Sequence, residues 1–314
     1  MKFKKSIDAQ ERVELARILD RAEEDIASHS RLGNFGRVQR LVRYGTKYGI
    51  FIFAKLGFFK NIPLIARTFW GRELRINVLD VSDGTFSHIY FSGMLDGASE
   101  GRLAKFFIKN LKQDDIFYDI GANYGFYTHL AELFVTKGQI HSFEPIPRPY
   151  QVLENNTLQS KNIFINNKAL SDKIGRVILH QSVGGTGGST INDDVVNLVY
   201  KGENFGKVSA EETTLDEYAK THTPPTVIKL DVEGAEAKVI AGGARTLRTY
   251  KPIIAMEVWP GGKGERFSMP AVRKLYDLGY ISHTINDAGE LARVDLIDTE
   301  TINEDFDNFI FIHP

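Results

Sequence analysis

The feature that most constrains the fold is an alternation of short apolar runs and longer amphipathic segments, which begins near residue 114. Seven runs have the length and composition of strands, at residues 116–120, 139–143, 163–167, 226–231, 252–257, 280–285 and 309–312. Segments with apolar residues at helical spacing lie between most of them. This alternation predicts a doubly wound α/β fold, in which a mostly parallel seven-stranded sheet carries helices on both faces.

The N-terminal part of the chain has a different pattern. Residues 6–29 place apolar residues on one helical face and charges on the other. Residues 26–72 contain no Asp or Glu but nine Lys or Arg, interleaved with aromatic and aliphatic side chains. Residues 73–92 look like strands. We therefore expect a mainly helical, basic extension at residues 1–90 and an α/β domain at residues 91–314.

Composition excludes several kinds of chemistry and location. The 314 residues carry a formal net charge of −1, so bulk charge does not indicate a polyanion-binding protein. The chain has no cysteine, which rules out disulfides, thiol nucleophiles, cysteine-ligated zinc and iron–sulfur clusters. No apolar run follows the basic residues 1–5, and Tyr48–Phe59 is shorter than the roughly 20 apolar residues that span a bilayer. We expect a cytoplasmic protein.

The turn after the first strand of the sheet has the sequence Asp119-Ile-Gly-Ala-Asn-Tyr-Gly125. A glycine turn between a buried strand and a helix is the context of a nucleotide-binding site, where Gly121 permits a tight turn and Gly125 a close approach. In a nicotinamide site this turn binds a pyrophosphate. The carboxylate of Asp119 would repel a pyrophosphate and favours a cationic ligand instead.

A second acid stands where a ribose is normally bound. Glu144 ends the second strand of the sheet, 25 residues after Asp119, and an acid at that place binds ribose hydroxyls. The alternative is that Asp119 caps a helix and that Glu144 is a loop carboxylate beside Pro145. The combination of an acid-first turn, its strand context and Glu144 favours the ligand site.

Further motifs occur in a characteristic order. They are Phe117-Tyr-Asp-Ile-Gly-Ala-Asn-Tyr-Gly125, Phe143-Glu-Pro145, Asn155-Asn156, Ala169-Leu-Ser-Asp172, Thr214-Leu-Asp216 and Ile228-Lys-Leu-Asp-Val-Glu-Gly-Ala-Glu236. Over about residues 90–260 the chain thereby resembles the FkbM-type class I methyltransferases, which use S-adenosylmethionine (SAM). The resemblance implies a Rossmann-like methyltransferase sheet. It also implies methyl transfer to an oxygen, usually a hydroxyl of a sugar, glycan, glycolipid or secondary-metabolite scaffold.

The same resemblance implies which residues hold the cofactor. The methionine part would contact Asp119, Gly121, Asn123 and Gly125, the ribose would contact Glu144, and the adenine would lie beside Ala169. We expect the cofactor-binding set to include Ala122, Thr128, Pro145 and Asp231 as well. The first hundred residues lie outside the domain common to the family, and the resemblance says little about them.

Acids after the fourth core strand are candidates for the chemistry of the acceptor. A hydroxyl is a poor nucleophile until it loses its proton, and a general base contributes roughly 10²–10⁴-fold. Asp231 and Glu233 follow the strand at the edge where ligands bind, and Lys229 lies two residues before Asp231. We assign Asp231 to positioning of the cofactor or acceptor, and Glu233 is the candidate base.

Alternatives remain open for these acids. Glu233 and Glu236 stand at the start of a helix, where acids stabilise the helix dipole in any case. Glu257, after the fifth core strand, is either a further candidate or a loop acid. Asp231, Glu233 and Glu257 together would suit a divalent cation, but their spacing does not require one, so we predict no metal. For His129 and His141 we favour packing or surface roles.

Two further segments, Gly184–Gly188 and residues 26–72, lie outside the core motifs. Gly184–Gly188 lacks the Lys-Ser/Thr pair of a phosphate-binding loop and is either a lid over the acceptor or an inert connection. The basic segment at residues 26–72 would suit an anionic membrane surface or an acidic acceptor, and the alternative is a helical cap with solvated arginines.

Three rival functions differ from the methyltransferase in what they require. A nicotinamide-dependent oxidoreductase is disfavoured by Asp119. An amino-directed nucleic-acid methyltransferase would carry a Pro-Pro-aromatic motif where this chain has Asp231-Val-Glu-Gly234, although the basic segment keeps an RNA methyltransferase as the alternative. A non-catalytic SAM-binding module is the third. The sequence identifies neither the acceptor nor the oligomeric state.

Overall fold

The structure is a computed structural model. It describes residues 7–30, 42, 44–53, 56, 58, 63–77, 84–95, 97–182, 190, 196, 205–259, 265–297 and 307–314. The Gly184–Gly188 loop lies outside these residues. Within them, no helix combines the length and the apolar character needed to cross a membrane.

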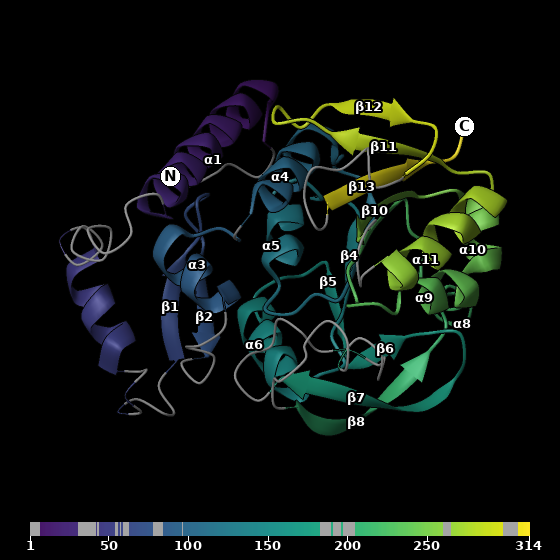
Figure 1. Cartoon of the computed structure of the whole chain (residues 1–314), viewed down its shortest axis with the longest axis horizontal. Helices are drawn as coiled ribbons and strands as arrows, with labels where there is room; N and C mark the ends of the chain where they lie inside the picture. The colour runs from purple at the N-terminus through teal and green to yellow at the C-terminus, as the bar shows by residue number, and fades with distance from the viewer. Residues whose placement is uncertain are drawn as a thin grey trace.

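An eight-stranded sheet forms the centre of the molecule (Figure 1). Its strand order is β12-β11-β13-β10-β9-β3-β4-β5. The bounds are β3 Ile116–Ile120, β4 Gln139–Phe143, β5 Ile163–Asn166, β9 Val227–Leu230, β10 Ile253–Val258, β11 Ile281–Ile285, β12 Leu291–Val294 and β13 Asp307–Ile312. The strands from β10 to β5 pair in parallel, whereas β13, β11 and β12 are joined by antiparallel pairings. The predicted doubly wound, mostly parallel sheet is confirmed.

The predicted number of seven strands was wrong by one. The additional strand, β12, pairs antiparallel with β11 after a tight turn that Gly289 completes at φ +76°. In β12 the two central residues, Ala292 and Arg293, are both exposed. The strand therefore lacks the alternation of buried and exposed side chains that identifies a strand in a sequence.

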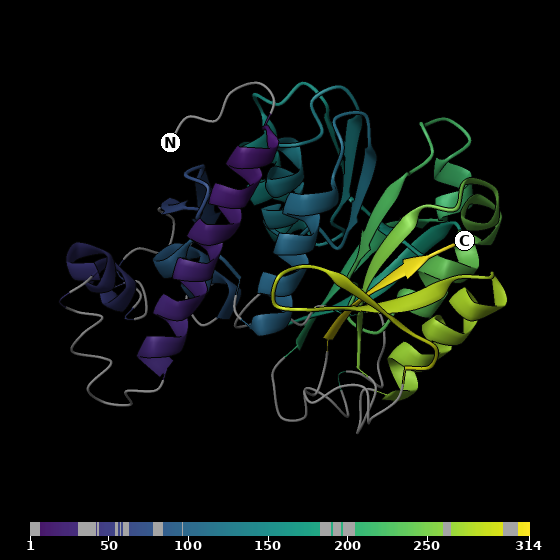
Figure 2. The ribbon, with the colours of Figure 1, turned by 90° about the horizontal axis from the view of Figure 1, so that it is seen from above.

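Helices cover both faces of the sheet (Figure 2). The helices on one face are α4 (Ala98–Asn110), α5 (Phe126–Glu132) and α6 (Pro147–Thr157), and those on the other are α9 (Glu236–Gly242), α10 (Ala244–Tyr250) and α11 (Glu265–Asp277). Strand β3 contributes to both cores, because Phe117 points to the α4–α5 side and Tyr118 to the α9–α11 side. Its five residues are thus almost wholly buried, which explains why four of them are hydrophobic and makes Asp119 a buried acid.

A small second sheet and a broken helix complete the α/β part. Strands β6 (Lys168–Leu170), β7 (Gly175–Ser182) and β8 (Phe205–Thr213) form a three-stranded sheet, and α8 (Leu215–Tyr218) follows it. The single helix predicted from residue 235 to 247 is in fact α9 and α10, which meet at Gly243. A Cβ at Gly243 would lie 2.7 Å from the Leu215 side chain, so the close approach of α8 requires glycine there.

The N-terminal part packs onto the same core. It contains α1 (Ala9–Ser30), a helix at residues 44–53, the hairpin β1 (Pro63–Arg67) and β2 (Glu73–Asn77), and α3 (Gly84–Ser92). The strand predicted at residues 88–91 was wrong, because these residues belong to α3. Three hydrophobic residues in a row, Ile89 to Phe91, do not distinguish the helical period from that of a strand. Leu15 and Leu19 of α1 share a core with α4. The division into residues 1–90 and 91–314 stays a prediction.

Candidate functional site

The site begins at the turn between β3 and α5. The backbone N–H groups of Gly121 and Ala122 both donate to the carbonyl oxygen of Phe143, each at 3.0 Å. Strand β3 lies between β4 and β9, which pairs Asp119 with Ser142 on one side and with Lys229 on the other. Because all three strands are parallel, their carboxyl ends open at one edge of the sheet, where α/β proteins bind their ligands.

Two glycines make this turn possible. Gly121 has φ +85°, and a Cβ there would lie 1.8 Å from the carbonyl oxygen of Asp231. Gly125 has φ +84° and begins α5, and a Cβ there would lie 2.5 Å from the Leu153 side chain. Asn123, between them, also has positive φ, at 48°. The backbone is therefore held in a conformation that few other residues tolerate at these positions.

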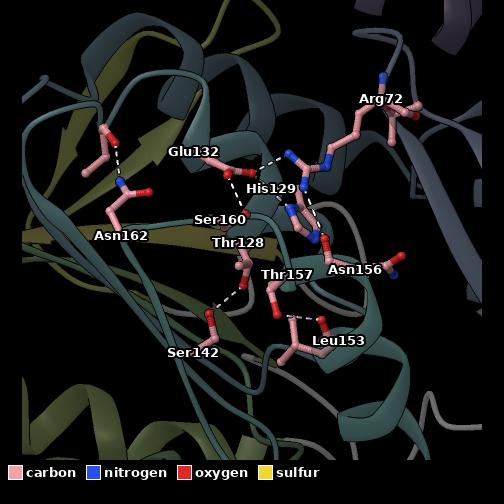
Figure 3. Close-up of polar contacts among 12 residues, drawn as sticks. Arg72, Thr128, His129, Glu132, Ser142, Leu153, Asn156, Thr157, Ser160 and Asn162 are labelled. Atoms are coloured by element: carbon pink, nitrogen blue, oxygen red, sulfur yellow. Dashed lines mark hydrogen bonds and ion pairs between the residues drawn. The ribbon is translucent and has the colours of Figure 1, made fainter. Parts of the chain in front are cut away.

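Asp119 is buried with one carboxylate oxygen left for a ligand. Only 1% of its surface is exposed, and its Oδ2 accepts a 2.6 Å hydrogen bond from the Thr128 hydroxyl. Thr128 is held in turn by the Ser142 hydroxyl at 2.7 Å (Figure 3). Oδ1 has no hydrogen-bond partner in the described structure. Burial raises the pKa of Asp119, while the Lys229 charge opposes that rise.

Glu144 holds the turn together and is placed for a second ligand contact. Its Oε2 accepts the N–H of Asn123 at 2.9 Å, and its Oε1 accepts the N–H of Ile146 at 2.8 Å. Each carboxylate oxygen retains a further lone pair, which a hydroxyl would use. Burial raises the pKa of Glu144 to about 7. Glu144 therefore stabilises the loop through two backbone contacts, and its remaining lone pairs could accept hydrogen bonds from a ligand.

Ala169 and Pro145 occupy the flank of this region. Ala169 is 7% exposed and lies in β6, which contacts the central sheet at β4. Pro145 is half-buried and directly follows Glu144. Ala122 is also buried. A buried carboxylate with an unused oxygen, a glycine-lined turn and a neighbouring acid together fit the amino group and the ribose of SAM.

A buried lysine joins the acids of the two neighbouring strands. Lys229 Nζ donates to Asp231 Oδ2 at 2.9 Å and lies 5.3 Å from the centroid of the Tyr127 ring. Burial lowers the pKa of Lys229, but the surrounding carboxylates outweigh it, Asp231 most strongly, and the pKa stands above its usual value. Lys229 therefore stays a cation and compensates the negative charge gathered at this edge.

The turn after β9 separates the roles of Glu233 and Glu236. Glu233 is half-buried and has φ +54°, and the Thr190 hydroxyl donates to its carbonyl oxygen at 2.6 Å. A left-handed backbone conformation costs of order 1–3 kcal/mol at a residue other than glycine, and residues held in this conformation concentrate at functional sites. Glu236 Oε1 accepts the N–H groups of Val232 and Gly234, so it holds together the turn between β9 and α9. Burial raises the pKa of Glu236 to about 7.

Three residues that the sequence did not indicate, Tyr127, Glu100 and Asn308, lie next to the Lys229–Asp231 pair. Tyr127 donates from its hydroxyl to Glu100 Oε2 at 2.7 Å, and the Asn308 amide donates to Glu100 Oε1 at 3.2 Å. Burial raises the pKa of Glu100, and the Lys229 charge opposes it. Nothing in the local sequence marks Glu100, because it lies in α4 and meets Asn308 of β13 only through tertiary packing.

Glu257 lies at the end of β10, near the same acids. Its Oε2 accepts the indole N–H of Trp259 at 3.0 Å. Burial raises the pKa of Glu257 well above its usual value, and the charges of Asp231 and Glu233 add to the rise. In the part of the chain that the structure describes, no three His, Asp or Glu side chains are grouped so that they would hold a metal ion.

The two histidines are buried packing residues. His141 Nδ1 lies 2.8 Å from the Tyr218 hydroxyl, and burial lowers its pKa to about 4. His129 Nδ1 lies 3.2 Å from Glu132, which also pairs with Arg72 (Figure 3). The contacts of Glu132 join α5 to the N-terminal hairpin.

A groove of about 620 Å³ lies between that hairpin and the end of α6. Its lining includes Arg72, Arg75, Glu132, Asn156 and Leu158. The groove is thus separate from the carboxyl edge of the sheet, since no residue of the Asp119, Glu144 and Lys229 region lines it.

Comparisons with known proteins agree with the motifs. A family model described as the methyltransferase FkbM domain matches residues 119–282, just over half of the chain. The 2-O-methyltransferase NoeI of Sinorhizobium fredii is 30% identical over 148 residues, which cover 43% of this chain and 60% of NoeI. The hexuronic acid methyltransferase AglP of Haloferax volcanii is 26% identical over 162 residues, which cover 51% of this chain and 62% of AglP. The chain thus spans about three fifths of the length of these relatives.

Among solved structures, a methyltransferase FkbM from Methylobacillus flagellatus is similar at 15% identity. The match covers 75% of this chain and 53% of that protein, with a TM-score of 0.44.

Proposed function

The chain belongs to the FkbM methyltransferase family, and on that premise we propose that it transfers a methyl group from SAM to a hydroxyl oxygen of a sugar or glycan. The names of two relatives, a 2-O-methyltransferase and a hexuronic acid methyltransferase, support an acceptor of this class. The residues matched by the family model include the Asp119 turn, Glu144 and the Lys229–Asp231 pair.

The observation that carries the proposal is the buried carboxylate of Asp119 with its unused Oδ1. Leaving such an acceptor unsatisfied costs about 1–3 kcal/mol, so a cationic donor there is strongly favoured. Thr128 fixes the orientation of the carboxylate, so that Oδ1 is the oxygen left for the ligand. When bound, SAM supplies an electrophilic methyl group on a sulfonium.

The remaining cofactor contacts follow from the same turn. Gly121, Ala122, Asn123 and Gly125 would hold the methionine part through backbone groups. Glu144 would accept hydrogen bonds from the ribose hydroxyls with the lone pairs that its two backbone contacts leave free. Ala169 and Pro145 would border the adenine.

For the acceptor, we assign positioning to Asp231 and proton removal to Glu233. Lys229 donates to Asp231 Oδ2, and this contact holds the Asp231 side chain in place to accept a hydrogen bond from the acceptor hydroxyl. Glu233, on the strained turn two residues later, would take the hydroxyl proton as the new oxygen–carbon bond forms. Orienting the acceptor and the methyl donor in line supplies much of the rate in such a reaction.

The test is methyl transfer from radiolabelled SAM to a panel of neutral sugars, uronic acids and oligosaccharides, with product analysis by mass spectrometry and NMR. We expect a methyl ether on oxygen. The Glu233→Gln variant should lose roughly 10²-fold or more in kcat while it still binds S-adenosylhomocysteine. The matched control is Glu211→Gln, an exposed acid on β8. A product methylated on nitrogen, or a Glu233→Gln variant with the kcat of the parent, would contradict the proposal.

A further inference from the structure

The helix at residues 44–53 is apolar on more than one side. On its inner side, the rings of Tyr44, Tyr48 and Phe51 pack against Phe91 of α3, with ring centroids 5.2, 6.1 and 5.2 Å apart. This aromatic cluster attaches the helix to the body of the protein. Apolar side chains on a helix normally face the core, but several on the outer side of this helix are exposed.

The outer side of this helix, the helical residue Val42 just before it and the turn after it expose an unusual density of large apolar side chains. They are between 36% and 80% exposed: Val42, Ile50, Ile52, Phe53, Leu56 and Phe58. Of the fourteen exposed large apolar residues in the described part of the chain, these six fall within seventeen positions. Single exposed apolar residues are ordinary, but a gathering of this kind marks a surface that another phase or molecule covers. Figures 1 and 2 show this helix, in dark blue beyond α3, at the outer edge of the molecule.

The charge of the surrounding sequence indicates what covers this surface. Residues 26–72 carry nine Lys or Arg and no acid, although the whole chain is nearly neutral. Two of the nine are engaged within the protein, because Lys47 donates to the Tyr90 carbonyl oxygen and Arg72 pairs with Glu132. A second copy of the chain would bring two segments of the same sign together, which is unfavourable. An anionic bilayer offers both an apolar interior for the side chains and negative headgroups for the bases.

We propose that the exposed apolar side of the helix at 44–53, continued by Leu56 and Phe58, docks the protein on an anionic lipid surface. Ten helical residues extend only about 15 Å, half the thickness of a hydrocarbon core, so the helix lies on the membrane and does not span it. The apolar side chains enter the headgroup boundary, and the bases set the preference for negative lipid.

Vesicle flotation of the full chain tests this surface. One set of vesicles contains phosphatidylcholine alone, and the other adds phosphatidylglycerol. The variant Leu56→Ser with Phe58→Ser removes side chains that are 66% and 70% exposed. The matched control, Leu158→Ser with Ile174→Ser, removes side chains that are 71% and 65% exposed elsewhere on the molecule. Thermal unfolding of each variant shows whether the fold is kept.

We expect the parent and the control variant to float with anionic vesicles only and to be released by salt. The docking variant should bind at least about tenfold more weakly, because each lost side chain contributes through its buried apolar area. Equal binding of the parent to both vesicle types, or equal binding of the docking variant and the parent, would overturn the proposal. So would a parent dimer in light scattering that the docking variant abolishes, in the absence of vesicle binding. None of these readouts depends on methyl transfer.

Discussion

Replacing Glu144 by glutamine should remove a pH dependence from the binding of S-adenosylhomocysteine. Burial raises the pKa of Glu144 to about 7, so the carboxylate is half formed at pH 7 and disappears as the pH falls. In our account only the carboxylate accepts both ribose hydroxyls. The affinity then follows the ionised fraction, and it falls about tenfold, or ~1.4 kcal/mol, between pH 8 and pH 6.

The assay is isothermal titration calorimetry of the parent and two variants across that pH range. Glu144→Gln should bind more weakly at high pH, because one amide oxygen cannot accept from both Asn123 and Ile146, which costs about 1–3 kcal/mol. Its affinity should then stay level as the pH falls. The control Glu154→Gln, an exposed residue of α6, should keep the slope of the parent. A parent without the tenfold fall, or a Glu144→Gln variant that retains it, would refute the reasoning.

Three further substitutions test the site. Thr128→Val removes the hydroxyl that donates to Asp119. We expect S-adenosylhomocysteine to bind about fivefold more weakly in the same titration, a loss of ~1 kcal/mol in binding free energy. Unchanged affinity would show that the contact between Thr128 and Asp119 does not contribute to binding. Lys229→Met leaves Asp119 and Asp231 without their cation, so the free energy of unfolding in urea should fall by about 3–5 kcal/mol at pH 8. Burial raises the pKa of Asp119 and of Glu100, so protonation of these two carboxyls at pH 5 relieves the repulsion and the loss should be smaller; equal losses would contradict this. Gly121 has φ +85°, and Gly121→Ala would place a Cβ 1.8 Å from the carbonyl oxygen of Asp231. The substitution should destabilise the fold by about 3 kcal/mol, measured by thermal unfolding. A variant that melts at the temperature of the parent would contradict this steric argument.

The central strands were predictable because their signal is local. Strand β3 is buried on both faces, and between Asp115 and Gly121 all of its residues except Asp119 are hydrophobic. The same reasoning places Asp119, Glu144 and Asp231 at one edge of the sheet, since Asp119 lies next to the carboxyl end of its parallel strand and the other two directly follow theirs. The strand pattern therefore predicts that these three acids lie at the same edge of the sheet.

Other parts of the site were not predictable from local sequence. Glu100 and Asn308 are 208 residues apart in the chain, and they meet because α4 packs against β13. Strand β12 was missed because its two central residues are both exposed, so it shows no alternation of buried and exposed side chains. In the N-terminal part, the hydrophobic residues from Ile89 to Phe91 are compatible with the period of a helix or of a strand, and packing against the helix at 44–53 selects the helix.

The most direct test of the central claim is a calorimetric titration of the purified protein with SAM, S-adenosylhomocysteine and NAD, together with an Asp119→Ala variant. The account predicts that both adenosyl ligands bind the parent, that NAD does not, and that Asp119→Ala loses most of the affinity. If NAD alone binds, or if Asp119→Ala binds SAM as tightly as the parent, the assignment of a SAM site to the turn after β3 is wrong.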